Sequence, residues 1–316
     1  MMSRRTISLL AAISAAWTLA ASPSGAALPT HAELRAKTDR FLERRPAVSQ
    51  RLGGSGGVRG GGGPGAVLPG SRVVSFYGAP QMNQTILGMR GPASAASALA
   101  QQAAPYETLG ERPVIAEFDL VSVFATAGGG PDGLYRSRQD PEVIDIYLRR
   151  ARAADARLML DIQPGRATFA DELEALADYV AEPDVDVAID PEWNVGRRGI
   201  PGRSIGRVTA KEVNAVSRTL ARTVRAYGLP PKLLVVHQFR RGSVRGRGEI
   251  RQRPGVQVLL NFDGIGSPEP KAAGYAALTT PRLFDGFSLF YSRDTPLMKP
   301  GAVLRLEPEP DFLLYQ

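Results

Sequence analysis

The sequence predicts an α/β protein of the (β/α)8 TIM barrel type, incomplete or irregular at its closing edge. Short runs rich in Val, Ile, Leu and Phe alternate with segments of helical periodicity, which indicates buried parallel strands. Most of these runs end in polar residues spaced two apart, which point the same way from a strand. An open doubly wound sheet is the alternative, but it would gather polar groups at one switch point, whereas a barrel brings every strand end to one mouth.

We expect strands at the apolar runs themselves, because each is short and rich in β-branched residues. The closing strand has two candidates, Val303–Leu306 and Phe312–Tyr315. The clear runs are Val73–Tyr77, Val114–Asp119, Arg157–Gln163, Val185–Glu192, Leu233–Phe239, Val256–Asp263 and Phe284–Tyr291.

Three of the intervening helices have recognisable start signals. Asp140 stands before Pro141 as an N-cap, while Thr168 and Thr209 each precede an acidic residue with the spacing of a capping box. Gly228 ends the third of these helices, because glycine adopts the left-handed conformation at a helix C-terminus.

The first 27 residues have the pattern of a secretory signal peptide. Arg4 and Arg5 precede the apolar run Ile7–Ala21, and small residues follow as far as Ala27. The run is too short and too rich in alanine for a membrane span. Export by the Sec route or by the twin-arginine route is open, because residues 3–7 also fit a twin-arginine signal. The chain has no Cys, so we expect no lipid anchor and no disulfide.

Residues 28–71 are expected to separate this signal from the barrel domain, 72–316. They contain a polar and helical stretch, His31 to Arg45, and a glycine-rich tether at 52–66. The tether is not a phosphate loop, because no Gly-Lys-Ser/Thr follows it.

The formal net charge of the 316-residue chain is +8, carried mainly by arginine. The simplest interpretation is a solvated basic surface, and attraction to an acidic envelope polymer is the alternative. We expect no nucleic-acid partner and no stable membrane anchor. The expected partner is a polysaccharide or cell-envelope glycan, and the expected state is a monomer.

The segment Asp190-Pro191-Glu192-Trp193 is the sharpest candidate for a catalytic site. Two carboxylates spaced two apart on a strand would both face the barrel mouth, and glycoside hydrolysis uses such a pair as acid and as base or nucleophile. Crowding separates the pKa values of the two members, so that one can stay protonated. The structural alternative is that Asp190 only holds a neighbouring loop.

Other strand ends carry further candidates. Asp263 stands before Gly264, so a simple Asp-Gly turn is its alternative role. His237 is expected either as a general base or as a buried histidine bonded to an acidic residue. The full catalytic set is Glu192, Asp190, Asp119, Asp161 and Asp263, and the substrate-binding set is Tyr77, Glu117, Gln163, Trp193, His237 and Tyr291.

No cofactor and no metal are expected. One candidate His without Cys disfavours zinc, and no loop has the ligand spacing of a calcium site. Six arginines crowd the segment after His237, which is either a clamp for an anionic polymer or a solvated loop. They are Arg240, Arg241, Arg245, Arg247, Arg251 and Arg253.

Several short motifs together resemble a group of secreted bacterial hypothetical proteins of actinobacterial type with a glycoside-hydrolase-like TIM barrel. The resemblance covers most of 72–316 and implies a fold and an exported location, without an established substrate. This chain lacks the lipidated Cys of the lipoprotein members. The motifs are SFYGAP, LDIQPG, AIDPEWNVG, PGRSIG, VVHQF, NFDGIG and LFYSRDTP.

The sequence thus predicts a secreted or envelope-associated glycoside hydrolase that uses carboxylates as acid and base. A glycan-binding barrel without catalysis is the main alternative, and a metal-dependent hydrolase of a phosphorylated polymer is a weaker one. The step from barrel to glycosidase is an analogy at the level of the fold.

Overall fold

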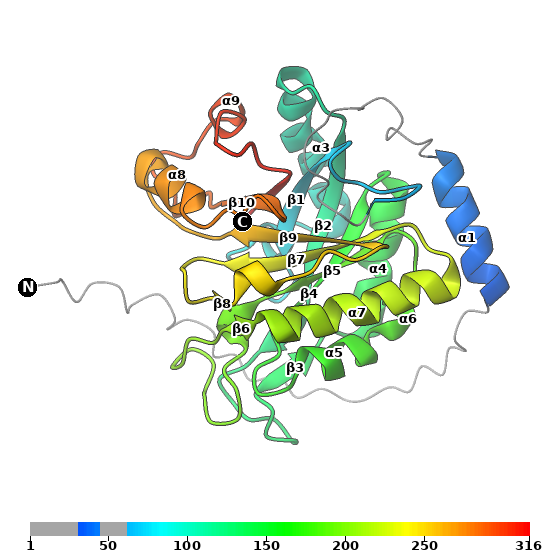
Figure 1. Ribbon diagram of the computed structural model, residues 1–316, viewed down its shortest axis with the longest axis vertical. Coiled ribbons are helices and arrows are strands. Elements are labelled where there is room, and N and C mark those ends of the chain that lie inside the picture. The colour runs from blue at the N-terminus through cyan, green and yellow to red at the C-terminus, as the bar shows by residue number, and fades with distance from the viewer. Residues whose placement is uncertain (1–30, 45–61) are drawn as a thin grey trace, which may run out of the picture.

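The computed structural model describes residues 31–44 and 62–316. The expected signal peptide and most of the glycine-rich tether lie outside these residues. The described chain forms a closed barrel of eight parallel strands with helices on its outside, which confirms the predicted fold class (Figure 1). Neighbouring strands follow the order β1-β11-β10-β9-β7-β5-β4-β2, and the pairing of β1 with β2 closes the ring.

The predicted strands are all present; the largest changes at their ends are that the run from Val114 continues to Ala125 and that the run from Val185 stops at Ile189. Phe312–Tyr315 is the closing strand, and the alternative Val303–Leu306 is wrong because Val303 ends a helical turn. The barrel strands are β1 (Arg72–Gly78), β2 (Val114–Ala125), β4 (Arg157–Ile162), β5 (Val185–Ile189), β7 (Lys232–Gln238), β9 (Val256–Phe262), β10 (Phe284–Leu289) and β11 (Phe312–Tyr315).

Helices of very different length cover the outside of the barrel (Figure 1). None of the helices in the described residues is long and apolar enough to cross a membrane. The helices are α1 (His31–Arg44), α2 (Ile86–Met89), α3 (Pro92–Leu109), α4 (Pro141–Ala153), α5 (Phe169–Ala175), α6 (Ala177–Val180), α7 (Ala210–Tyr227), α8 (Pro268–Ala276) and α9 (Pro300–Val303).

The helix starts follow the predicted caps. Asp140 accepts a hydrogen bond from the Glu142 amide at the start of α4. Thr209 and Glu212 form a complete capping box at the start of α7, and Gly228 ends that helix with φ of 63°. Thr168 caps α5 in one direction only, and its helix breaks after Ala175 into α5 and α6.

The polar stretch before the tether is helical as expected. It forms α1, which contacts α7 on the outside of the barrel (Figure 1). Lys37 of α1 is paired with Glu182, which stands between α6 and β5. The barrel is therefore contacted by a segment that precedes the tether.

Aromatic contacts show which face of each strand points outward. Phe118 of β2 packs edge-on against Tyr147 of α4 at 5.8 Å between ring centroids. Phe262 and Phe287, of β9 and β10, both contact Tyr275 of α8. Because side chains alternate along a strand, the neighbours of these aromatic residues point into the barrel.

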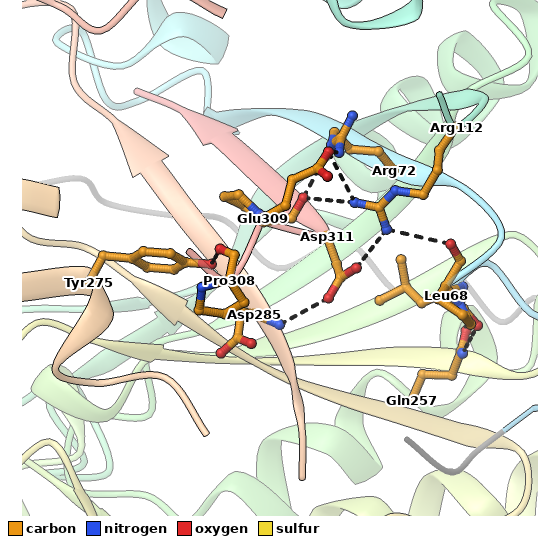
Figure 2. Close-up of polar contacts among 11 residues, drawn as sticks. Leu68, Arg72, Arg112, Gln257, Tyr275, Asp285, Pro308, Glu309 and Asp311 are labelled. Carbon is orange, nitrogen blue, oxygen red and sulfur yellow. Dashed lines mark hydrogen bonds and ion pairs between the residues drawn. The ribbon is translucent and has the colours of Figure 1, made fainter. Parts of the chain in front are cut away.

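The barrel closes through a network at its N-terminal face (Figure 2). Arg112, just before β2, pairs with Asp311 at 2.7 Å, and Asp311 also accepts from the Asp285 amide at 3.3 Å. Arg72 is fully buried and pairs with Glu309. These contacts join the beginnings of β1, β2, β10 and β11, which are the strands on either side of the closing edge.

The packed chain begins upstream of Arg72, the expected start of the barrel domain. Val67 and Leu68 are buried, and both amides donate to Gln257 Oε1 at 3.0 and 3.1 Å. Gln257 donates in return to the Leu68 carbonyl at 2.5 Å (Figure 2). The segment just before β1 therefore covers the N-terminal end of β9.

Candidate active site

Polar side chains from most barrel strands meet at the C-terminal ends of the strands, where barrel enzymes keep their active sites. Mutual electrostatic effects place five of the predicted acidic residues together with His237, because each perturbs others of the set. The acidic mouth, as we call this cluster, consists of Asp119, Asp161, Asp190, Glu192, Asp263 and His237.

Asp263 is the most firmly held carboxylate of the acidic mouth. His237 Nδ1 lies 2.7 Å from Asp263 Oδ2, and Asn261 Nδ2 donates to Asp263 Oδ1 at 2.7 Å. Ser288 of β10 also donates to Oδ1. Three donors from β7, β9 and β10 therefore fix this carboxylate, and a carboxylate that accepts several hydrogen bonds is suited to its ionised form.

Asp263 therefore does more than close an Asp-Gly turn. Its side chain is 17 % exposed, so it borders the open end of the barrel. The bond from His237 corresponds to the buried-histidine alternative of the sequence prediction, and that histidine holds one of the candidate catalytic acids.

Glu192 is the second acidic residue that is only partly buried. Burial and the charge of Asp263 raise the pKa of Glu192 to about 7, while His237 and Arg240 lower it. The Glu192 carbonyl accepts from the Gly206 amide at 2.6 Å, which anchors the backbone here. Glu192 thus combines access from the mouth with a pKa near neutrality, as a general acid requires.

The local backbone around Glu192 differs from the predicted strand. β5 ends at Ile189, and Pro191–Trp193 form a turn of 3-10 helix, η2. Asp190 caps this turn through a 3.3 Å bond from the Glu192 amide. Asp190 and Glu192 are therefore not consecutive inward positions of one strand. The two carboxyl groups still interact as predicted. Burial and the charge of Glu192 raise the pKa of Asp190 well above its usual range.

Asp119 and Asp161 form the floor of the acidic mouth. Both are completely buried, and neither has a hydrogen bond of normal geometry among the described residues. Burial and the charge of Asp161 raise the pKa of Asp119 well above its usual range. Burial raises the pKa of Asp161 to about 6, although the charge of His237 and the hydroxyl of Tyr77 lower it. The prediction that Asp119 stands at a strand end is wrong, because β2 continues to Ala125.

Tyr77 and Gln163 stand beside this floor. Gln163 Nε2 donates to the Tyr77 hydroxyl at 3.0 Å, and Gln163 Oε1 accepts from the Ala125 amide at 3.2 Å. Burial and the charge of Asp161 raise the pKa of Tyr77 well above its usual range. The phenol therefore stays protonated and can donate to Asp161.

The acidic residues around His237 favour the charged form of its imidazole. Burial alone would lower its pKa, but the carboxylates of Asp263, Asp161 and Asp190 raise it well above the usual range. Its Nε2 is buried and has no partner among the described residues. In its charged form the imidazole offsets part of the negative charge of these acidic residues.

Two predicted binding residues lie away from the acidic mouth. Glu117 is fully buried deeper in the barrel, where burial and the charge of Asp186 raise its pKa. The Tyr291 hydroxyl donates to Gln102 of α3 at 2.6 Å, and its ring contacts Tyr315 at 5.5 Å. Trp193 remains next to the mouth in sequence, half-buried at the end of η2.

Sequence reasoning missed two residues that organise the site. Ser288 and Asn261 hold Asp263 and are bonded to each other at 2.7 Å. Asn261 stands two residues before Asp263 on the same inward face, so its spacing could have identified it as a neighbour of that carboxylate. Ser288 is a single hydroxyl near the end of an apolar run and carries no such signal.

The described residues contain no group of three or more His, Asp or Glu side chains arranged to hold a metal ion. A comparison with protein-family models finds no match for this chain, and a comparison with curated proteins finds none either. The fold and the site by themselves define an α/β barrel with a carboxylate cluster at its C-terminal mouth.

Proposed function

We propose that this protein is a secreted glycoside hydrolase that acts on an extracellular or envelope polysaccharide with Glu192 as general acid and Asp263 as its carboxylate partner. The observation that carries the proposal is the contrast between these two neighbouring acids. Glu192 has its pKa raised to about 7, whereas Asp263 receives hydrogen bonds from three donors.

The reaction follows from this contrast. Glycoside hydrolysis needs one protonated carboxyl group to deliver a proton to the leaving oxygen and one ionised carboxylate on the other side. Glu192 holds a proton near neutral pH because burial, and then the charge of Asp263, raise its pKa to about 7. Asp263 serves either as the nucleophile or as the base that activates water, and His237, Asn261 and Ser288 keep its two oxygens in place.

The floor of the acidic mouth supports a polyhydroxylated substrate. The carboxyl oxygens of Asp119 and Nε2 of His237 have no hydrogen-bond partner among the described residues, whereas Asp161 faces the Tyr77 hydroxyl. Buried polar atoms gain most from hydrogen bonds, because leaving them unpaired is costly. Sugar hydroxyls both donate and accept, and can therefore pair with either kind of group.

The first test compares hydrolysis by the wild type and two variants. Glu192→Gln removes the transferable proton and Asp263→Asn removes the anion, so each should lower the release of reducing ends by about 100-fold or more. Glu249→Gln is the matched control, because Glu249 is an exposed acid of a neighbouring loop. A panel of polysaccharides with different linkages supplies the substrate, and the melting temperature monitors folding.

The proposal fails if Glu192→Gln and Asp263→Asn release reducing ends as fast as Glu249→Gln does. It also fails if the folded wild-type protein binds members of the panel and cleaves none of them. That second result would instead support a glycan-binding barrel without catalysis.

A further inference from the structure

Two loops at the open end of the barrel carry an unusual density of unpaired positive charge. The first loop, residues 194–207, follows η2 and contains no acidic residue, and the second, residues 239–247, follows β7. Their exposed arginines form no ion pair with any described residue; we call them the arginine rim. They are Arg197, Arg198, Arg203, Arg207, Arg240, Arg241 and Arg245.

The two loops are joined into one platform. β6 (Val208–Thr209) follows the first loop and pairs in parallel with β8 (Val244–Arg245) of the second. The Val208 amide donates to the Ser243 carbonyl at 2.9 Å. Arginines that are far apart in the sequence are therefore held on adjoining backbone segments.

This platform is attached directly to the candidate catalytic residues. The Gly206 amide donates to the Glu192 carbonyl at 2.6 Å, and the Asn194 side chain donates to the Arg207 carbonyl at 2.9 Å. Arg166, after β4, donates to the Gly199 carbonyl at 2.7 Å and fixes the middle of the first loop. Arg240 stands over the Phe239 ring at 5.3 Å, and its charge reaches Glu192.

Not every arginine of this region belongs to the rim. Arg247 donates to the Leu278 carbonyl at 2.7 Å, and Arg253 donates to Ser217 Oγ at 3.0 Å. Both are half-buried; Arg247 ties the end of the second loop to Leu278, and Arg253 lies beyond that loop and contacts α7. The side chains of the rim arginines donate no such hydrogen bond to the described residues, and all seven residues are exposed.

We propose that the arginine rim binds an anionic glycan, a chain bearing carboxylate, sulfate or phosphate groups, and leads it to Glu192. The guanidinium group suits this task, because it stays charged and can pair with such groups through two hydrogen bonds. An exposed basic surface beside a site also raises the local concentration of an anionic substrate. This inference rests on the proposed function, since it names the substrate class of the same site.

Binding measured without turnover tests the inference separately from catalysis. The probes are polygalacturonate for carboxylate groups, dextran sulfate for sulfate groups, neutral dextran of matched length, and a DNA duplex. We compare the wild type with Arg197→Gln/Arg198→Gln in the first loop and Arg241→Gln/Arg245→Gln in the second. Arg149→Gln/Arg222→Gln, on α4 and α7, removes the same charge from exposed positions of the outer helices.

Each rim pair should weaken the binding of at least one anionic glycan by about 2- to 30-fold, which is what two exposed ion pairs contribute. The control pair should change it by less than about twofold, and neutral dextran should bind far more weakly throughout. The response to the two anionic glycans shows which group the rim prefers. Added salt should weaken binding in the same order, because it screens exposed charges.

Three results would overturn the inference. An equal loss in the control pair would show that net charge alone attracts the glycans. Equal affinity for neutral dextran would show that the arginines play no part, and tighter binding of the duplex would indicate a nucleic-acid surface. If rim-dependent binding holds while Glu192→Gln leaves hydrolysis unchanged, the proposed catalytic function is wrong and the arginine rim remains a glycan-binding surface.

Discussion

The acidic residues of the mouth are costly to the folded chain. A carboxyl group taken out of water favours its neutral form, and neighbouring anions add to this effect. Asp161 is fully buried and its pKa is raised to about 6, so its ionised form opposes folding. Such a cost is typical of residues kept for binding or catalysis rather than for stability.

Asp161→Asn should stabilise the protein in a pH-dependent way. The unfolded chain ionises Asp161 near pH 4, whereas the folded chain retains the proton up to about pH 6. The wild type therefore loses stability as the pH rises between these values, by on the order of 3 kcal/mol from this group. Thermal melts should give the variant a higher Tm at pH 7 and a much smaller advantage at pH 4.

Asp178→Asn, at an exposed position of α6, serves as the control. It should show no comparable dependence of the difference in Tm on pH. A Tm difference for Asp161→Asn that shrinks as the pH rises from 4 to 7 would contradict the assigned direction of the pKa shift.

Among the elements, α7 links the outer layer of helices to the mouth. Its N-cap, Thr209, belongs to β6, which pairs with β8 of the second arginine-bearing loop. The Glu212 side chain accepts from the Thr209 amide at 2.8 Å, which completes the capping box. Thr209 thus starts α7 and also ends β6, which belongs to the platform beside the acidic mouth.

Thr209→Ala should lower the free energy of unfolding by about 1 kcal/mol, because it removes the side-chain cap. Thr223→Ala lies within the same helix and replaces threonine by a better helix former, so it should be neutral or slightly stabilising. Urea unfolding measures both. Equal losses for the two variants would show that the cap contributes nothing specific.

At this scale the sequence predicted the elements well and their ends less well. Apolar runs and caps depend on local composition, so β7, α4 and α7 could be recognised directly. The extension of β2 to Ala125 could not, because it depends on the antiparallel partner β3 (Arg136–Arg138). The turn of 3-10 helix at Pro191–Trp193 is likewise set by the Asp190 cap and the bond to Gly206.

At the scale of the whole molecule, the two ends of the barrel have different roles. The N-terminal face joins the closing strands through Arg72, Arg112 and Asp311, whose contacts serve stability (Figure 2). The C-terminal mouth gathers unpaired and partly exposed carboxyl groups instead. Within the mouth, β9 pairs with β7 on one side and with β10 on the other, which places His237 and Ser288 on Asp263.

The sequence could therefore predict which residues belong to the site better than which of them are hydrogen-bonded to one another. Polar residues near strand ends indicated Asp161, Asp190, Glu192 and Asp263, and the structure brings these four residues near one another. The bonds between His237 and Asp263 required the barrel register, which no local pattern contains. Tyr291 ends an apolar run in the same way, but the bond to Gln102 draws it toward α3.

The pH dependence of kcat/KM on a cleaved polysaccharide tests the central claim most directly. Glu192 must be protonated to act as general acid, so the rate should fall about tenfold per pH unit above its pKa of about 7. The residual activity of Glu192→Gln should lack this decline, while Glu249→Gln should retain it. A wild-type rate that rises through pH 7, or a decline that persists in Glu192→Gln, would contradict the assignment of Glu192 as the acid of a barrel glycosidase.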